Sequence, residues 1–204
     1  MCKMHFLQPG YSLSTQSLWN AFRQGDEQAF TTIFVEHYDA LYNYGIKLVN
    51  DEELVRDSMQ ELFQKLWERR AALEAVEIIK PYLFKVLRNR ISDNLKMASR
   101  RSARQQVYHE EEFEMMYSPE DFLVAKQFSS EQDARLLAVL NQLPRRQREV
   151  LYLKYFDGLS YEKISEVMSL TAQSVRNLVY RAISALKELL LLLVLLLQQV
   201  QVRS

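Results

Sequence analysis

The stretch LPRRQREVLYLKYFDGLSYEKISEVMSLTAQSVRNLVYRAISALK, residues 143–187, decides the fold because two helix starts follow one another within it. Ser160 and Thr171 are good N-cap residues, and each has a leucine before it and an aliphatic residue at the fourth helical position, as in a hydrophobic staple. Between them the sequence predicts a helix over residues 161–168 and a turn over residues 169–171. A short helix, a tight turn and a longer helix form the helix-turn-helix pattern.

The longer helix of this pattern divides into an apolar face and a polar face. Its apolar residues recur at helical spacing and are expected to face the core: Val175, Val179, Ala182 and Leu186. Its polar residues are expected to contact DNA: Gln173, Ser174, Arg176, Asn177, Tyr180 and Arg181. Gln173 and Asn177 can bond adenine, and Arg176 can bond guanine. Phosphate contacts suit the remaining arginines better: Arg181, and Arg145, Arg146 and Arg148 in the preceding helix. That preceding helix should end at Asp157-Gly158.

Helical spacing also fills residues 15–101. We expect helices over 15–24, over 27–48, from the capping signature Asn50-Asp51-Glu52-Glu53, and from Pro81 to about Arg101. The third helix should bury Val55, Met59, Leu62 and Leu66, and the fourth Leu83, Val86, Leu87, Ile91 and Leu95. The fourth also carries a polar face with helical spacing: Lys85, Asn89, Asp93, Lys96 and Arg100.

Charge is distributed unevenly although the formal net charge is +0. Eight basic residues and one acid lie between Lys80 and Arg104, whereas residues 109–121 hold six acids and no lysine or arginine. A basic helix beside an acidic connector indicates a polyanionic partner, with nucleic acid first. Residues 102–130 lose helical periodicity, so they are predicted to be a linker. The fold class expected is therefore all-α, with two small helical domains, 15–101 and 131–190, joined by a flexible acidic linker.

Composition narrows the classes of function. The 204 residues include only 4 glycines and 4 prolines, which disfavours a fold of many short strands. One cysteine and 3 histidines offer no zinc cluster, and no nucleophile–base set or glycine-rich phosphate loop is present, so we expect neither a cofactor nor an enzyme. No apolar window reaches transmembrane length and no signal peptide is evident, which predicts a cytoplasmic protein.

Three motifs in this order resemble the two-domain bacterial sigma factors of the extracytoplasmic-function (ECF) group. Asp57, Gln60, Phe63 and Trp67 have the spacing D-x-x-Q-x-x-F-x-x-x-W, and PYLFKVLRNRISDNLK at residues 81–96 places Asn89 and Asp93 in a basic helix. LPRRQREV and the GLSYEKISEVM helix-turn-helix complete the set. The resemblance covers about Leu18 to Leu189. Tyr82, Lys96 and Leu178 depart from the family pattern, and Leu178 would either contact a thymine methyl or pack on the preceding helix.

The resemblance implies a role for each helix. Polymerase contacts, on the clamp helices of the β′ subunit, would come from Asp57, Gln60 and Glu61. Reading and melting of the minus-ten element would come from Lys85, Arg88, Asn89, Asp93, Lys96 and Arg100. The helix from Ala172 would read the minus-thirty-five element, and the linker would thread toward the polymerase active site. Core polymerase, including its β subunit, promoter DNA and an anti-sigma factor are the implied partners. Phe63 and Trp67 are expected in the core rather than in a contact.

Two other interpretations remain at the level of the sequence. A stand-alone helix-turn-helix regulator that binds duplex DNA as a dimer would explain residues 143–187 but not the basic helix. An all-helical enzyme is disfavoured by the missing chemistry. The tail, residues 191–204, belongs to neither domain, and its run Leu189 to Leu197 is apolar on every side of a helix. We expect this run to dock on the first domain, on an inhibitor or on a second copy, unless it is a sticky terminus without function.

Overall fold

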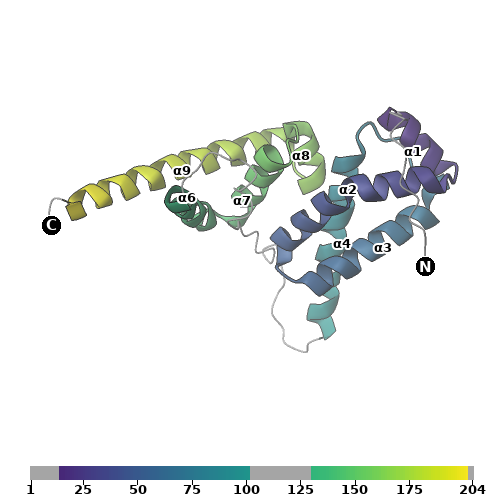
Figure 1. Ribbon diagram of the computed structural model, residues 1–204, viewed down its shortest axis with the longest axis horizontal. Coiled ribbons are helices and arrows are strands. Elements are labelled where there is room, and N and C mark those ends of the chain that lie inside the picture. The colour runs from purple at the N-terminus through teal and green to yellow at the C-terminus, as the bar shows by residue number, and fades with distance from the viewer. Residues whose placement is uncertain (1–13, 102–129, 202–204) are drawn as a thin grey trace.

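A computed structural model describes the backbone of residues 14–101 and 130–201, and the side chains of residues 14–97 and 136–189. Helices account for both described ranges, which contain no strand. The first domain comprises α1 (Thr15–Arg23), α2 (Glu27–Val49), α3 (Glu52–Glu68), a 3₁₀ turn η1 (Arg70–Ala72) and α4 (Ile79–Arg101). The second comprises α6 (Ser130–Gln142), α7 (Arg145–Leu151), a π-helical turn η3 (Tyr152–Phe156), α8 (Tyr161–Met168) and α9 (Ala172–Gln201). Figure 1 shows the two groups side by side. The predicted linker at 102–130 lies almost wholly outside the described residues.

Side-chain caps start the helices of the first domain. Asp26 Oδ1 accepts hydrogen bonds from the backbone N–H groups of Gln28 and Ala29, and Asp51 Oδ1 accepts one from Leu54 N–H at 3.0 Å. An N-cap therefore forms ahead of α3 as predicted, but it is Asp51, and Leu54 rather than a glutamate is the third helical residue, so the predicted capping-box pattern is wrong. Asn50 ends α2 in the left-handed region at φ 44°.

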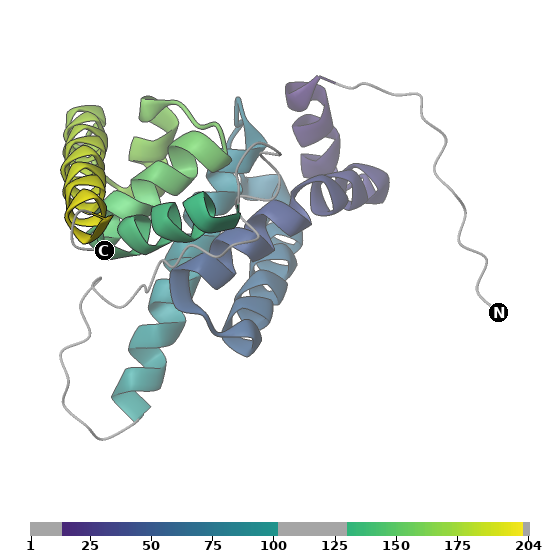
Figure 2. The same cartoon turned by 60° about the vertical axis from the view of Figure 1, so that its left-hand side comes forward.

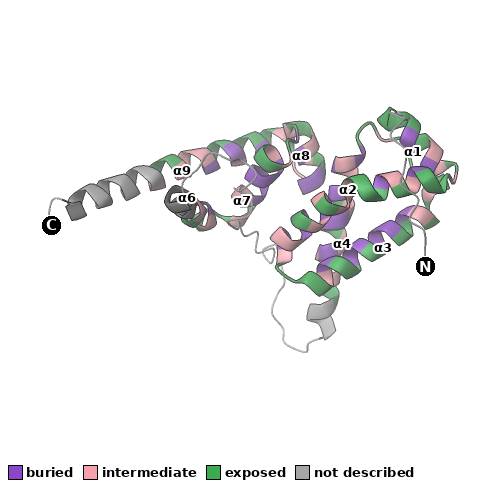
Figure 3. Cartoon of the chain, viewed as in Figure 1, coloured by how far each residue is buried: buried purple, intermediate pink, exposed green. Residues whose placement is uncertain are grey.

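The core of the first domain follows the predicted apolar stripes, which appear as inward-facing purple bands in Figure 3. Buried residues of the predicted set are Val55, Met59, Leu62 and Leu66 on α3, and Leu83, Leu87 and Ile91 on α4. Val86 and Leu95 are only half-buried, so that part of the prediction is wrong. The start of α4 also differs, since the helix begins at Ile79 rather than Pro81. Proline is tolerated there because the first turn needs no intrahelical N–H bond.

The helix-turn-helix has the predicted boundaries. Ser160 Oγ accepts a hydrogen bond from Lys163 N–H at 3.2 Å and starts α8, and Thr171 Oγ1 accepts one from Ser174 N–H at 3.1 Å at the start of α9. Gly158, at φ 69°, ends the preceding helix as expected. The π-helical turn that continues α7 was not predicted. It makes that helix end in a wider coil than the sequence pattern indicates.

The two domains pack directly against each other. Figures 1 and 2 show α8 beside α4, and these two helices form the main contact between the domains. Tyr44 of α2 and Tyr152 of the π-helical turn stack across this contact, with ring centroids 6.2 Å apart. The helices that the sequence predicts to read DNA therefore belong to neighbouring, packed domains in this structure.

The C-terminal helix α9 is one uninterrupted helix from Ala172 to Gln201, and it extends past α6 away from the first domain (Figure 1). The apolar run Leu189 to Leu197 lies within it. Side chains from Leu190 onward lie outside the described residues, so docking of the run stays a prediction. None of the described helices combines the length and the hydropathy that a membrane crossing requires.

Candidate nucleic-acid interface

The N-terminal half of α9 presents the predicted polar face. Val175, Val179 and Ala182 are buried, which turns the opposite side of the helix outward. Of the six predicted DNA-binding residues, Ser174 is half-buried. The other five are exposed: Gln173, Arg176, Asn177, Tyr180 and Arg181. Tyr180 is the most exposed of the large apolar or aromatic side chains described, at 74%. The six residues therefore lie together on one side of α9, as the sequence predicts.

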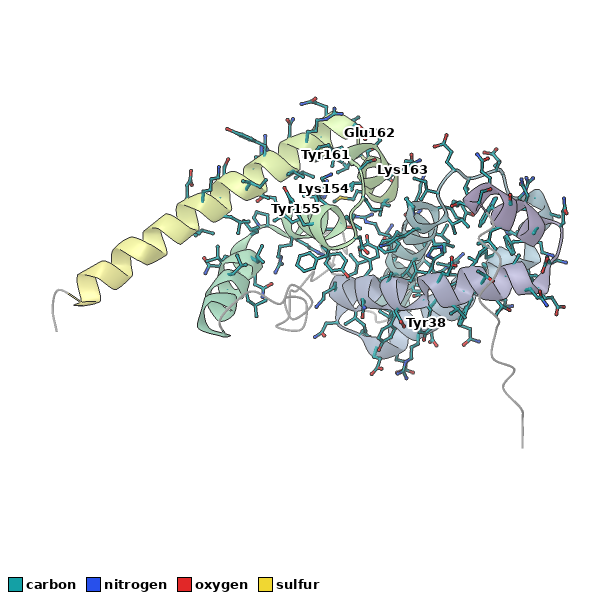
Figure 4. The ribbon with its side chains drawn as sticks, turned by 45° about the horizontal axis from the view of Figure 1, so that its top comes forward. Tyr38, Lys154, Tyr155, Tyr161, Glu162 and Lys163 are labelled. Carbon is teal, nitrogen blue, oxygen red and sulfur yellow. The ribbon has the colours of Figure 1, made fainter. Side chains whose placement is uncertain are left out.

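Hydrogen bonds already fix several side chains of this face. Gln173 Nε2 donates to Asn177 Oδ1 at 3.1 Å, and Arg176 Nη2 donates to Glu162 Oε1 of α8 at 3.0 Å. The guanidinium of Arg176 also lies 5.7 Å from the ring centroid of Tyr161. Figure 4 shows Tyr161 and Glu162 together at the start of α8. The pKa of the Glu162 carboxyl is lowered, because the carboxyl accepts hydrogen bonds from its own backbone N–H and from Ser160 and lies near the Arg176 charge.

The arginines expected at phosphates differ in exposure. Arg146 and Arg181 are exposed, whereas Arg145 and Arg148 are half-buried. Arg148 Nη1 donates to the carbonyl oxygen of Asn141 at 3.2 Å, so part of its hydrogen-bonding capacity stabilises the end of α6. Leu178 is half-buried against the core of its domain, which favours packing over a contact with a thymine methyl.

On α4, the second predicted reading surface is exposed and unpaired. Within the described residues, Lys85, Asn89, Asp93 and Lys96 are exposed and make no hydrogen bond or ion pair. We call these four residues the α4 stripe. A hollow of about 480 Å³ opens beside it, lined by Glu61, Lys65, Arg90, Asp93, Asn94, Lys96 and Met97. Arg100 lies on the same helix, but its side chain falls outside the described residues.

Arg88 is the exception on α4, because it is not exposed in this packed arrangement, and its contact with DNA stays a prediction. Its side chain is buried, at 5% exposure, because the second domain covers it. Arg88 Nε donates to Glu149 Oε1 of α7 at 2.8 Å, and Tyr44 Oη donates to the same oxygen at 2.7 Å. Burial and the negative charge of Glu149 raise the pKa of Tyr44 well above its usual value, so Tyr44 keeps its proton and donates. No pattern in the sequence pairs positions 61 residues apart, so this contact was missed.

The predicted polymerase-binding residues lie on the outer side of α3. Asp57 and Gln60 are exposed, and Glu61 is half-buried with its Oε2 3.6 Å from Arg90 Nε. Gln60 borders an apolar groove of about 570 Å³, which was not predicted from the sequence. The groove is lined by Phe30, Phe34, Tyr38, Arg56, Met59, Gln60, Phe63, Gln64 and Trp67. The signal was the aromatic spacing Phe30, Phe34, Tyr38 and Tyr42 along α2, one ring per helical turn.

Phe63 and Trp67 were expected in the core. Phe63 is buried at 5% exposure, and Trp67 is half-buried beneath the guanidinium of Arg70, 4.2 Å from its ring centroid. In the described part of the chain, no group of three or more His, Cys, Asp or Glu side chains is placed to hold a metal ion.

Comparison with known proteins assigns both domains. Residues 33–101 match the family Sigma-70 region 2, and residues 133–186 match Sigma-70, region 4. The chain is 26% identical over 179 residues to the RNA polymerase sigma-H factor of Pseudomonas aeruginosa, with 86% of this chain and 93% of the relative covered. It is 25% identical over 179 residues to the ECF RNA polymerase sigma factor SigW of Bacillus subtilis, with 81% and 91% covered.

Solved structures agree in fold. The sigma factor RpoE in complex with the anti-sigma factor NepR from Bartonella quintana aligns with a TM-score of 0.59 at 24% identity, covering 80% of this chain and 97% of that chain. CnrH in complex with the cytosolic domain of CnrY aligns with a TM-score of 0.57 at 20% identity, covering 87% and 97%. A helical region 2 followed by a helix-turn-helix region 4 defines the class of promoter-specificity subunits. The chain belongs to the ECF group of RNA polymerase sigma factors.

Proposed function

We propose that this sigma factor uses three separate surfaces to bring core polymerase to specific promoters. Asp57, Gln60 and Glu61 on α3 bind the clamp helices of the polymerase β′ subunit. The α4 stripe, with Arg88 and Arg100, holds the melted minus-ten strand, and the polar face of α9 reads the minus-thirty-five duplex. The factor performs no chemistry itself and acts in the cytoplasm, where the polymerase works.

The observation that carries this proposal is the exposure of two polar helix faces on one chain. Gln173, Arg176 and Asn177 present amide and guanidinium groups, which suit base edges in the major groove. On α4, Lys85 and Lys96 flank Asn89 and Asp93, so cations for phosphates alternate with groups that bond unpaired bases. Because both faces are tethered on one polymerase, the second contact becomes intramolecular, and two weak readers give one stable complex.

Trapping of unpaired bases provides the mechanism of melting. A surface that binds single-stranded DNA better than duplex shifts the equilibrium toward the melted state by its difference in affinity. The hollow beside the α4 stripe gives a splayed base a place to sit, next to Asn94 and Arg90. An anti-sigma factor would oppose these contacts by covering the same surfaces.

Reconstitution with core polymerase tests the proposal. The full-length factor added to core enzyme should give run-off transcripts from a subset of promoters in a genomic library, and core enzyme alone should not. Asp57→Ala with Gln60→Ala should reduce holoenzyme assembly without lowering helical content, since both side chains are exposed. Glu53→Ala, an exposed acid earlier on the same helix, is the matched control. A factor that binds duplex DNA tightly by itself but never co-purifies with core enzyme would contradict the proposal.

A further inference from the structure

The apolar groove of the first domain, which we call the α2–α3 groove, has a continuous aromatic floor. Each helix contributes three apolar or aromatic side chains to it: Phe30, Phe34, Tyr38, Met59, Phe63 and Trp67. The ring centroids of Phe34 and Phe63 lie 4.7 Å apart, and those of Phe30 and Trp67 lie 5.1 Å apart. Phe34 is 36% exposed, and Val35 beside it is 63% exposed. Adjoining apolar side chains left in water on one face indicate a surface that binds another apolar element.

The polar side chains of the α2–α3 groove restrict what can bind there. Arg56, Gln60 and Gln64 are exposed and complete the lining. Arg56 forms an ion pair with Glu52, one turn earlier on α3. The described lining therefore contains no acid and a single cation that already has a partner. An occupant that fits is apolar and uncharged, with amide or hydroxyl groups for the two glutamines.

The C-terminal end of α9 has this chemistry. Every residue from Leu189 to Leu197 is leucine or valine, so the helix is apolar whichever side it presents. Gln198 and Gln199 follow directly, and no charged residue lies between Leu189 and Val202. Leu189 and Leu197 are eight residues apart, as are Phe30 and Tyr38 on α2, so the run and the groove wall each span about 12 Å at 1.5 Å per residue. The run and the groove therefore match in length and in polarity.

In this structure the apolar end of α9 points away from the groove of its own chain. Figures 1 and 2 show α9 leaving α8 and extending past α6, away from α2 and α3. Because α9 continues without a break to Gln201, it does not turn back toward the first domain. A second copy of the chain, in contrast, can bring its groove to this end of α9 while both chains keep the structure described above.

We propose that residues 189–197 of α9 bind in the α2–α3 groove of a second copy of this chain. An apolar helix lying in an apolar groove is a common mode of recognition, and its driving force is the removal of both surfaces from water. The amides of Gln198 and Gln199 can exchange hydrogen bonds with Gln60 and Gln64 at the rim of the groove. Two such contacts related by a two-fold axis close a dimer, in which each tail occupies the groove of the other copy. This proposal does not depend on the promoter function proposed above.

Two complementary variants test the contact. Deletion of residues 191–204 leaves a groove without a tail, and Phe34→Glu leaves a tail with a charge in the groove. The full-length chain should form a concentration-dependent dimer in sedimentation velocity. Each variant alone should be monomeric, with the dissociation constant of self-association raised roughly 30-fold or more, as for loss of a hot spot. An equimolar mixture of the variants should form a complex of one chain of each, because an intact groove then meets an intact tail.

The matched control is Ile78→Glu, which places the same charge at an apolar position that is 49% exposed and outside the groove lining. This variant should dimerise like the unmodified chain. Circular dichroism and thermal melts establish that the variants are folded. Should Phe34→Glu unfold the first domain, Phe34→Gln takes its place with the same expected results, since it keeps a polar group in the groove without the charge.

Fluorescence of Trp67 shows whether the tail lies in the groove. The chain has 2 tryptophans, and Trp19 is only 1% exposed, so a change of emission on tail binding reports half-buried Trp67. Emission of the tail-deleted chain should move to shorter wavelength when the Phe34→Glu chain is added, because the bound helix removes water from the Trp67 ring.

Three results would overturn the proposal. A full-length chain that stays monomeric, with the same emission as the tail-deleted chain, would mean that the groove and the tail do not meet. A dimer that persists in Phe34→Glu and in Phe34→Gln would mean that the tails pair with each other instead. A monomer whose emission changes on tail deletion would mean that the tail binds the groove of its own chain. None of these measurements contains DNA or polymerase, so each remains decisive if the proposed promoter function fails.

Discussion

The polar faces of α9 and α4 differ in how firmly their side chains are held. On α9, Gln173 is bonded to Asn177 and Arg176 to Glu162, so three of the groups that face outward have partners that orient them. The α4 stripe has none among the described residues and borders a hollow. Reading of duplex edges requires side chains in fixed positions, whereas unpaired bases adjust to the surface that receives them. The difference matches the two kinds of DNA that we propose for the two faces.

The largest expected effect comes from emptying the α4 stripe. Lys85→Ala, Asn89→Ala and Lys96→Ala together should abolish open-complex formation, because phosphate contacts and a base contact disappear at once. Permanganate footprinting of the melted region measures open-complex formation. Holoenzyme assembly should survive, since the predicted polymerase-binding residues lie on α3.

An equal loss of holoenzyme assembly would mean that the stripe binds protein instead. The matched control is Arg69→Ala, which removes an exposed cation at the end of α3, outside the hollow beside the α4 stripe. Open complexes should persist in that variant. Their loss would show that total positive charge matters and that the particular face does not.

On α9 we expect a smaller but more selective effect. Arg176→Ala should lose about 1–3 kcal/mol of discrimination at one base pair of the minus-thirty-five element, as for loss of a bidentate base contact. Arg181→Ala should weaken binding to all sequences and reduce the salt dependence. Competition binding on single-base variants of the element separates the two outcomes. If Arg176→Ala left the base preference unchanged, its pairing with Glu162 would be purely structural.

The sequence predicted the second domain more completely than the contact between domains. Ser160, Gly158 and Thr171 act through their own backbone and near neighbours, so the pattern alone places α8 and the turn before α9. Arg88 was predicted to contact DNA, and its burial with Glu149 was not foreseen because that burial depends on how two separately folded units meet. The exposed groove on α2 and α3 was not predicted for a related reason. Aromatic spacing predicts a buried stripe, but it does not reveal which rings stay exposed to solvent.

The capping of α9 offers a test of the more rigid face. Thr171→Ala should lower the free energy of unfolding of the second domain by about 1 kcal/mol, because Ser174 N–H loses its acceptor. Chemical denaturation of the second domain measures the loss. Asn177→Ala, at an exposed position inside the same helix, should not reproduce it. An unaffected Thr171→Ala would mean that packing against α8 alone fixes the start of the helix.

The smallest effect concerns pH and should distinguish the domains. Burial lowers the pKa of His37 on α2; the Glu36 charge opposes the shift and the Lys80 charge adds to it. A lowered pKa means that the folded state binds the proton less well, so stability is full above pH 6.5 and declines as pH falls through the native pKa. The first domain should therefore lose stability in mild acid, and His37→Gln should flatten the loss. Thermal melts between pH 5 and 7 would show this loss of stability. An identical dependence of Tm on pH in the unmodified protein and in His37→Gln would rule out His37 as the cause.

The unbroken α9 has a mechanical consequence for DNA reading. Its 30 residues span about 45 Å at 1.5 Å per residue, with Gln173 and Arg176 near one end and the apolar run near the other. A helix without a hinge acts as a lever arm, so a torque applied at the tail rotates the base-reading side chains about the same axis. Whatever binds the last three turns would therefore also rotate the residues that we propose to read the major groove. A partner bound to the apolar end of α9 would in this way change which promoters the factor selects.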